Sequence, residues 1–136
     1  MISSRPGAAI ACGAICAVLL CLTLMGCGDS QNNALTDVGD PHRGRELLSS
    51  YGCGACHIIP GIRTARGLVG PPLSFYGDRT EIAGELPNTP ANLMHWIEHP
   101  EEVDPKTAMP DLGVSPQQAG DMTSYLYTLR GHRDYQ

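Results

Sequence analysis

The chain has 136 residues, a net charge of −5 and six cysteines. Its nine basic residues include a single lysine, and no basic cluster stands out. An acidic chain of this kind lacks the charge that binds phosphate backbones, so we expect no nucleic-acid partner. The length suits one small domain. With only one Phe, one Trp and five Tyr, its core would be thin without additional apolar material.

The first 26 residues are predicted to be a lipoprotein signal peptide. Arg5 precedes a largely apolar stretch, Ala8 to Met25, that carries no charge. The sequence from Leu24 to Cys27 resembles a bacterial lipobox, in which the Cys is lipidated and becomes the first mature residue. An uncleaved helix is the alternative, because about 18 apolar residues approach the minimum for spanning a membrane. Small residues and Cys dilute the stretch and favour the lipoprotein.

A polar tether is expected after the lipidated cysteine, over residues 27–39. The domain itself, residues 40–136, is expected to start with a helix. Asp40 can cap this helix, and Pro41 suits its first position. The apolar spacing of one helical face follows at Gly44, Leu47, Leu48 and Tyr51.

Residues 53 to 57 read Cys-Gly-Ala-Cys-His, a sequence typical of covalent haem attachment. Cys53 and Cys56 can add across the two porphyrin vinyl groups as thioethers, and His57 then falls under the ring centre as an iron ligand. A zinc site would need two more ligands at suitable spacing, and no second Cys pair follows. A redox-active dithiol would need a βαβ context, and no strand-like run flanks the motif. We therefore predict one haem c.

The remaining cysteines fit export and lipidation. Three of them leave with the signal peptide: Cys12, Cys16 and Cys21. Haem uses two more, which leaves Cys27 as a lone thiol in an oxidising compartment, where lipid would protect it. We expect an exported protein on the periplasmic side, anchored to a membrane by lipid on Cys27.

Residues 58–89 contain many Gly and Pro and no sustained period, which predicts a loop region. Wrapping a cofactor would account for a loop of this length. Thr89-Pro90 is expected to open a second helix that stops near His99-Pro100. Ser115-Pro116 is expected to open the last helix, which Gly131 closes. Its amphipathic stripe consists of Ala119, Met122, Leu126 and Leu129.

Met109 is the predicted sixth ligand of the iron. It lies in the irregular stretch Lys106 to Pro110, where a loop can bring its thioether to the open face of the ring. A thioether favours Fe(II) and raises the reduction potential. The other candidates are Met94, Met122, His42, His95, His99 and His132. The two methionines lie in predicted helices, where core filling is the usual role.

These motifs together resemble a class I cytochrome c domain over residues 40–131. The matching points, in order, are the first helix, the haem motif, Gly70-Pro71-Pro72-Leu73, the Met109 loop and the last helix. The resemblance implies an all-α fold of three to five helices wrapped around one covalent haem. It also implies an electron carrier rather than an enzyme.

The resemblance further implies roles for individual residues. The Pro71 carbonyl would accept the Nδ1–H of His57, which fixes the ring and raises its basicity. Arg79 would lie near a haem propionate, and Trp96 would pack on the haem. Thr107 matches a propionate-binding hydroxyl. Tyr125 on the last helix would pack against Gly44 on the first helix.

The stretches Pro60 to Leu73 and Leu86 to Pro90 also resemble small bacterial cytochromes c that are associated with haem-copper oxidases or fused to their copper-binding subunit. This likeness implies a one-electron carrier that donates to a membrane-bound terminal oxidase or another respiratory partner. The lysine ring of mitochondrial-type carriers is missing, with Lys106 nearly alone and Arg63, Arg66 and Arg79 as possible substitutes. Two alternatives stay open: an electron-accepting subunit of a periplasmic dehydrogenase, and a haem enzyme or gas sensor with an open sixth position.

Overall fold

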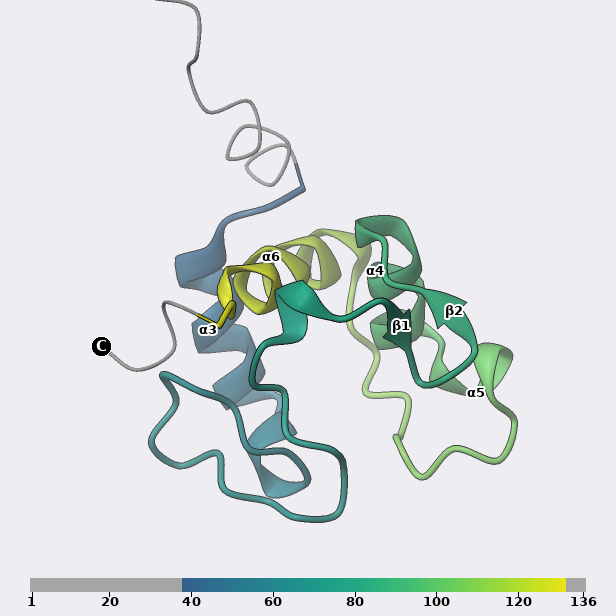
Figure 1. The fold of residues 1–136 in the computed structure, drawn as a ribbon, viewed down its shortest axis with the longest axis horizontal. Helices are drawn as coiled ribbons and strands as arrows, with labels where there is room; N and C mark the ends of the chain where they lie inside the picture. Colours follow the sequence, from purple (N-terminus) through teal and green to yellow (C-terminus); the bar gives the residue numbers. More distant parts are fainter. Residues whose placement is uncertain (1–37, 132–136) are drawn as a thin grey trace, which may run out of the picture. The chain divides into compact units, whose positions relative to one another are not determined.

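Four α-helices carry the described part of the chain, residues 38–131, in this computed structural model (Figure 1). In chain order they are α3 (Pro41–Ser50), α4 (Pro90–Glu98), α5 (Pro100–Val103) and α6 (Pro116–Thr128). None of these helices is long and apolar enough to cross a membrane. The predicted signal peptide, Cys27 and most of the tether lie outside the described residues.

The three long helices begin where the sequence predicts. Each has Pro in its first turn and a capping side chain just before it. Asp40 accepts the amide of His42 at 2.8 Å, and Thr89 accepts the amide of Asn92 at 3.3 Å. Ser115 forms a capping box with Gln118. These caps satisfy amides that the helices leave without an internal partner.

Helices α3 and α6 cross at very close range, and a glycine makes this possible. A Cβ at Gly44 would lie 2.0 Å from the carbonyl oxygen of Asp121, so only Gly fits. The atoms nearest to that Cβ position belong to the backbone of Asp121 and Met122. The packing of Tyr125 against Gly44 stays a prediction. The Tyr125 hydroxyl donates to the Pro60 carbonyl at 2.6 Å, which ties α6 to the loop after the haem motif.

The same crossing contains a buried carboxylate. Asp121 is only 3% exposed and accepts two hydrogen bonds from the Arg43 guanidinium, each 3.0 Å long. It also accepts the backbone amide of Asp40 at 2.7 Å. The hydrogen bond from Arg43 is the main reason that the pKa of Asp121 lies below its usual value. The charged group therefore links the start of α3 to the middle of α6.

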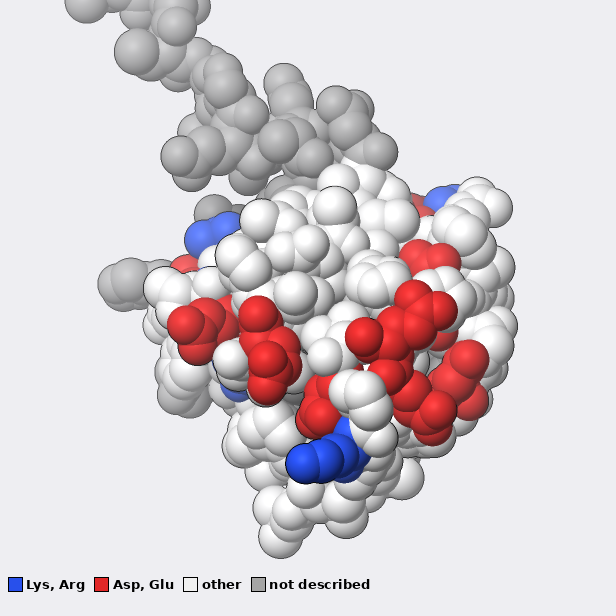
Figure 2. Space-filling model, turned by 90° about the vertical axis from the view of Figure 1, so that its right-hand side faces the viewer, with Lys and Arg blue, Asp and Glu red and all other residues white. Residues whose placement is uncertain are grey.

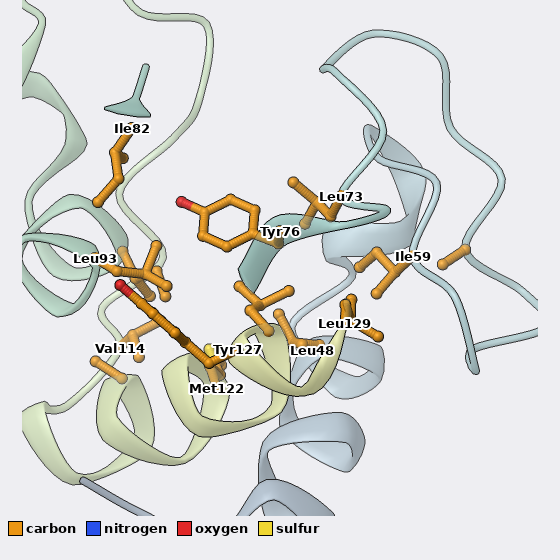
Figure 3. Packing of buried hydrophobic residues seen from close by; sticks show 14 residues of the cluster. Leu48, Ile59, Leu73, Tyr76, Ile82, Leu93, Val114, Met122, Tyr127 and Leu129 are labelled. Atoms are coloured by element: carbon orange, nitrogen blue, oxygen red, sulfur yellow. The ribbon is translucent and has the colours of Figure 1, made fainter. Parts of the chain in front are cut away.

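Buried apolar side chains from α3, α4, α6 and the loops meet in one cluster (Figure 3). Leu48 comes from α3, Leu93 and Ile97 from α4, and Met122 and Leu126 from α6. The irregular segments add further members to this core: Ile59, Ala65, Leu73, Tyr76, Ile82 and Val114. Loops thus supply a large share of the core, as expected for a chain that encloses a cofactor.

The region 58–89 has more structure than the predicted loop. A 3₁₀ turn, η2, spans Tyr76–Asp78, and a hairpin pairs β1 (Glu81–Ile82) with β2 (Leu86–Pro87). Two-residue strands are too short to show an alternating pattern, so the sequence gives no signal for them. The short helix α5 was also missed, because Pro100 reads as a stop although it occupies a first helical turn.

One asparagine holds this region together. Asn88 donates its side-chain amide to the carbonyls of Tyr76 and Arg79, at 3.0 and 2.9 Å. Its side-chain oxygen accepts the hydroxyl of Tyr127 at 2.9 Å. Both amide hydrogens and the side-chain oxygen of Asn88 therefore bond to η2, its flanking residue and α6, which fixes Tyr76 in the core.

Replacing Asp121 with Asn should destabilise the protein in a pH-dependent way. Asp121→Asn removes charged hydrogen bonds, and we expect a loss of about 1–3 kcal/mol in unfolding free energy at pH 7. The exposed Arg43 keeps the loss below that of a fully buried pair. Because folding lowers this pKa, the carboxylate's contribution is present above its ordinary value of 3.8 and disappears as the pH falls through the lower folded value.

Urea unfolding of the haem-loaded protein at pH 7 and at pH 3, followed by circular dichroism, measures this effect. The gap between wild type and Asp121→Asn should be largest at pH 7 and smaller at pH 3. Glu46→Gln, an exposed change on the same helix, is the control and should lie within about 0.5 kcal/mol of wild type. A gap that is equal at both pH values would contradict the role given to the Asp121 charge.

Candidate functional site

The two cysteines and the histidine lie on one tight turn just after the end of α3. Gly52 adopts a left-handed φ of 74°, and the 3₁₀ turn η1 (Cys53–Ala55) follows at once. The amide of His57 donates to the Cys53 carbonyl at 3.0 Å, as in an α-turn. Cys53, Cys56 and His57 are each half-buried. A single turn of backbone thus fixes the spacing of all three side chains.

A hydrogen bond fixes the ring of His57. Its Nδ1 lies 2.7 Å from the carbonyl oxygen of Pro71. A carbonyl can only accept, so Nδ1 carries the proton and Nε2 keeps a free lone pair for a metal. The contact expected for Pro71 is therefore present.

Gly70 lies flat against the same ring. A Cβ at this position would come within 2.3 Å of His57 Cε1 and 2.6 Å of Nδ1. The Gly70 amide also donates to the Cys56 carbonyl at 2.8 Å. In the sequence Gly70 is part of the Gly-Pro-Pro-Leu motif, but no local pattern indicates this steric role. The structure shows that the ring can take its position only because no side chain stands there.

An apolar cavity brings four of the predicted residues together: Cys53, His57, Trp96 and Met109. The cavity volume is about 70 Å³. The rest of the lining consists of Leu48, Leu73, Tyr76, Leu93, Ile97, Leu112, Val114, Met122 and Leu126. A shallower polar depression between α3 and α6 contains none of the predicted site residues.

Met109 reaches the cavity from an irregular loop, as predicted. Its backbone amide donates to the hydroxyl of Thr107 at 3.2 Å, and the Lys106 amide donates to Asp104 Oδ1 at 2.9 Å. These local turns hold the loop without helix or strand. Met122 also lines the cavity, but from α6, where it is almost fully buried. The cavity therefore contains two thioethers, one on a loop and one in the core.

The other predicted residues lie beside the cavity rather than in its wall. The Arg79 guanidinium donates to the carbonyls of Pro72 and Ser74 and lies 5.0 Å from the centre of the Tyr76 ring. Arg79 thus braces the segment that bonds His57. The Thr107 hydroxyl is half-buried and accepts the Met109 amide.

The cysteines lack the features of a zinc or dithiol site. Cys53 and Cys56 form no disulfide, and no group of three or more His, Cys, Asp or Glu converges for a metal within residues 38–131. Burial raises the pKa of the Cys53 thiol, the opposite of an activated thiolate. Two thiols on one turn, a histidine with a free Nε2 and an apolar cavity fit a covalently attached haem instead.

Several cavity residues carried no recognisable signal in the sequence. Tyr76 is buried in the wall, and this burial raises the pKa of its hydroxyl. It lies in an aperiodic segment, as do Leu112 and Val114, so no hydrophobic pattern marks them. Only their chain neighbours, the Gly70–Leu73 motif and Met109, could have suggested them.

Comparison with known proteins agrees with this geometry. The sequence profile of the Cytochrome c family matches residues 41–130. The cytochrome c oxidase subunit 2 of Alkalihalophilus pseudofirmus is 31% identical over 90 residues, which cover 65% of this chain and 25% of that protein. The subunit 2 of Bacillus subtilis is 29% identical over 87 residues, which cover 62% of this chain and 24% of that protein.

The matched span is thus about a quarter of the length of these relatives. The family match, by contrast, covers well over half of the present chain, from the first turn of α3 to just beyond α6. The helical architecture and the apolar cavity agree with it. The chain therefore belongs to the cytochrome c family, an electron-transfer family whose members carry a covalently attached haem c with its iron.

Proposed function

We propose that this chain is a one-electron carrier with His/Met ligation of its haem iron. Cys53 and Cys56 attach the porphyrin, and His57 and Met109 are the axial ligands. The observation that carries the proposal is the single cavity lined by both ligand side chains. When bound, the haem iron supplies the chemistry by alternating between its ferric and ferrous states.

The side chains around the cavity have separate tasks in this proposal. Pro71 holds the proton on Nδ1 of His57, which leaves Nε2 as the ligand atom. Thr107 holds the backbone of Met109, and Trp96, part of the cavity wall, would pack on the haem. Arg79, which braces the Pro72 carbonyl, would hold a propionate. A filled sixth position keeps oxygen and peroxide away from the iron, which suits a carrier rather than an enzyme or gas sensor.

The partner in this proposal is a membrane-bound haem-copper oxidase. Its support is the likeness to subunit 2 of cytochrome c oxidases, of which the matching segment is a part. The carrier works on the periplasmic side of a membrane. Lipid on Cys27 anchors it there, and residues 27–39 form the tether. Anchoring raises the effective concentration of the carrier near its partner and can replace steering by a lysine ring.

Replacing the loop methionine should change the iron without releasing the haem. In Met109→Leu, which keeps the volume, we expect the sulfur-to-iron charge-transfer band of the oxidised protein to vanish. The reduction potential should fall by on the order of 0.1 V, within the about 0.8 V that axial ligands span. Met122→Leu is the matched control and should keep both band and potential, with a stability loss under about 1.5 kcal/mol. Loss of the band in Met122→Leu alone would assign the ligand to α6 instead.

Adding a methyl group at Gly70 should disturb the ring of His57. Because the new Cβ would lie 2.3 Å from Cε1, we expect Gly70→Ala to turn the ring and weaken its bond to Pro71. The NMR signal of the His57 Nδ1 proton should shift, and overpacking should cost about 1–3 kcal/mol of stability. Gly131→Ala, whose Cβ would have ordinary contacts at 3.6 Å, is the control. A native Nδ1 signal in Gly70→Ala would show that the ring does not depend on this glycine.

Removing the lipidation site should release the protein from the membrane. We expect Cys27→Ser to move to the soluble fraction after cell breakage, because the tether has no other anchor in this proposal. Cys21→Ser, within the predicted signal peptide, should stay with the membranes. Immunoblots of both fractions give the answer. Retention of Cys27→Ser in the membrane fraction would favour an uncleaved N-terminal helix.

A further inference from the structure

Two histidines lie next to each other at the end of α4, outside the haem cavity. His95 and His99 are four positions apart, and the His99 amide donates to the His95 carbonyl at 2.8 Å. This spacing puts both side chains on one face of the helix. Both residues are exposed, and neither lines the haem cavity. Two histidines four positions apart on one helical face can bind one metal ion together.

The two imidazole rings already lie close to chelating distance. Their centres are 5.6 Å apart, and their planes meet at 60°. Two imidazoles that bind one metal through nitrogen, with bonds of about 2.0–2.1 Å, have ring centres roughly 5 Å apart at a tetrahedral angle. Small side-chain rotations would therefore direct one nitrogen of each ring at a common metal ion.

The electrostatic surroundings favour a dication at this position. The rings lie at the carboxyl-terminal end of α4, where the helix dipole is negative. Glu98, Glu101 and Glu102 lie in the same stretch of the chain. Figure 2, which views the molecule from the side where α5 is labelled in Figure 1, shows acidic side chains gathered on this face. These carboxylates define no site by themselves, but they attract divalent cations to the two histidines.

The nearest carboxylate to the rings belongs to Glu102 on α5. Its Oε2 lies 3.8 Å from His95 Nε2, and both side chains are open to solvent. No group of three His, Cys, Asp or Glu side chains converges on a common point within residues 38–131, so water has to complete the coordination of the metal. Glu102 is placed to accept a hydrogen bond from such a metal-bound water, as carboxylates around metal sites commonly do.

We propose that His95 and His99 form a surface site for a divalent transition metal, with water in the remaining coordination positions and Glu102 bonded to that water. Imidazole nitrogen suits Zn²⁺, Ni²⁺ and Cu²⁺, and Cu²⁺ binds most tightly of the three. The bound metal links the last turn of α4 to α5 through Glu102. The site shares no residue with the haem cavity, so it does not depend on the proposed electron-carrier function.

Zinc titration of the oxidised, haem-loaded protein tests the site without any redox reaction. Calorimetry with zinc chloride at neutral pH should show a site whose affinity falls at least about tenfold in His95→Asn and in His99→Asn, because each variant loses the chelate. His42→Asn removes an exposed histidine from α3 and is the matched control, which should bind zinc as wild type does. Unchanged affinity in both α4 variants would overturn the proposal.

NMR of the reduced, haem-loaded protein identifies the ligands directly. Zinc should shift the imidazole Hε1 signals of His95 and His99 together and leave the signal of His42 in place. If the signals of His95 and His99 did not move at zinc concentrations that saturate the calorimetric site, the metal would be bound elsewhere and the proposal would be wrong.

A pair of glutamine variants on α5 tests the role of Glu102. Glu102→Gln should weaken zinc binding about tenfold, as expected for a side chain that bonds another ligand of the metal. Glu101→Gln removes the same charge from the preceding exposed position and should weaken binding less than about threefold at physiological salt. Equal losses in the two variants would overturn the place given to Glu102 in the site.

Zinc should also stabilise the folded chain, because the two rings face each other only when α4 is formed. The urea midpoint of the haem-loaded wild type should rise with zinc concentration, and this rise should disappear in His95→Asn and in His99→Asn. Both substitutions are at exposed positions, so the variants should fold without zinc. A rise that persists in both variants would show that zinc stabilises the protein through another site and would overturn the proposal.

Discussion

The hydrogen bond between His57 Nδ1 and the Pro71 carbonyl is the contact on which the rest of the site depends. It assigns the proton to Nδ1 and leaves Nε2 as the only ring nitrogen that can bind a metal. It can form only because Gly70 lets the chain pass against the ring. Arg79 then donates to the carbonyls of Pro72 and Ser74, so contacts at Gly70, Pro71 and Arg79 together fix one imidazole. Ring orientation is thus set by this loop and not by the turn that carries the motif.

The helices supply the frame for this loop. Their role is to hold the walls of the cavity at fixed distance, and the crossing of α3 and α6 sets that distance through the bare backbone of Gly44. Asp121 strengthens the crossing by bonding both the Arg43 side chain and the Asp40 amide. The hydroxyl of Tyr125 then connects the frame to the loop at Pro60. The loop is therefore fixed to the helical pair at Pro60.

Much of this could be predicted because the strongest signals are local. Caps and prolines mark the starts of α3, α4 and α6, and a five-residue motif marks the haem turn. Met109 stood out because it lies outside any helix. The hairpin at Glu81–Pro87 could not be predicted because two-residue strands show no alternating pattern, and α5 could not because Pro100 looks like a helix stop. The buried Tyr76 lies in an aperiodic segment and packs against residues far away in the sequence. The Asp121–Arg43 pair joins residues 78 positions apart and leaves no local pattern either.

The division between helices and loops also explains which apolar side chains stay exposed. Helical residues near the cavity face inward, since the frame needs them for packing. In the loop after the haem motif, the amides of Gly67 and Gly70 donate to the carbonyls of Gly54 and Cys56. The side chains of Leu68 and Val69, between these two bonds, are exposed to solvent. Burying such a pair in a monomer would require another covering element. The exposure of this pair therefore follows from the backbone contacts that hold the loop against the haem-attachment turn.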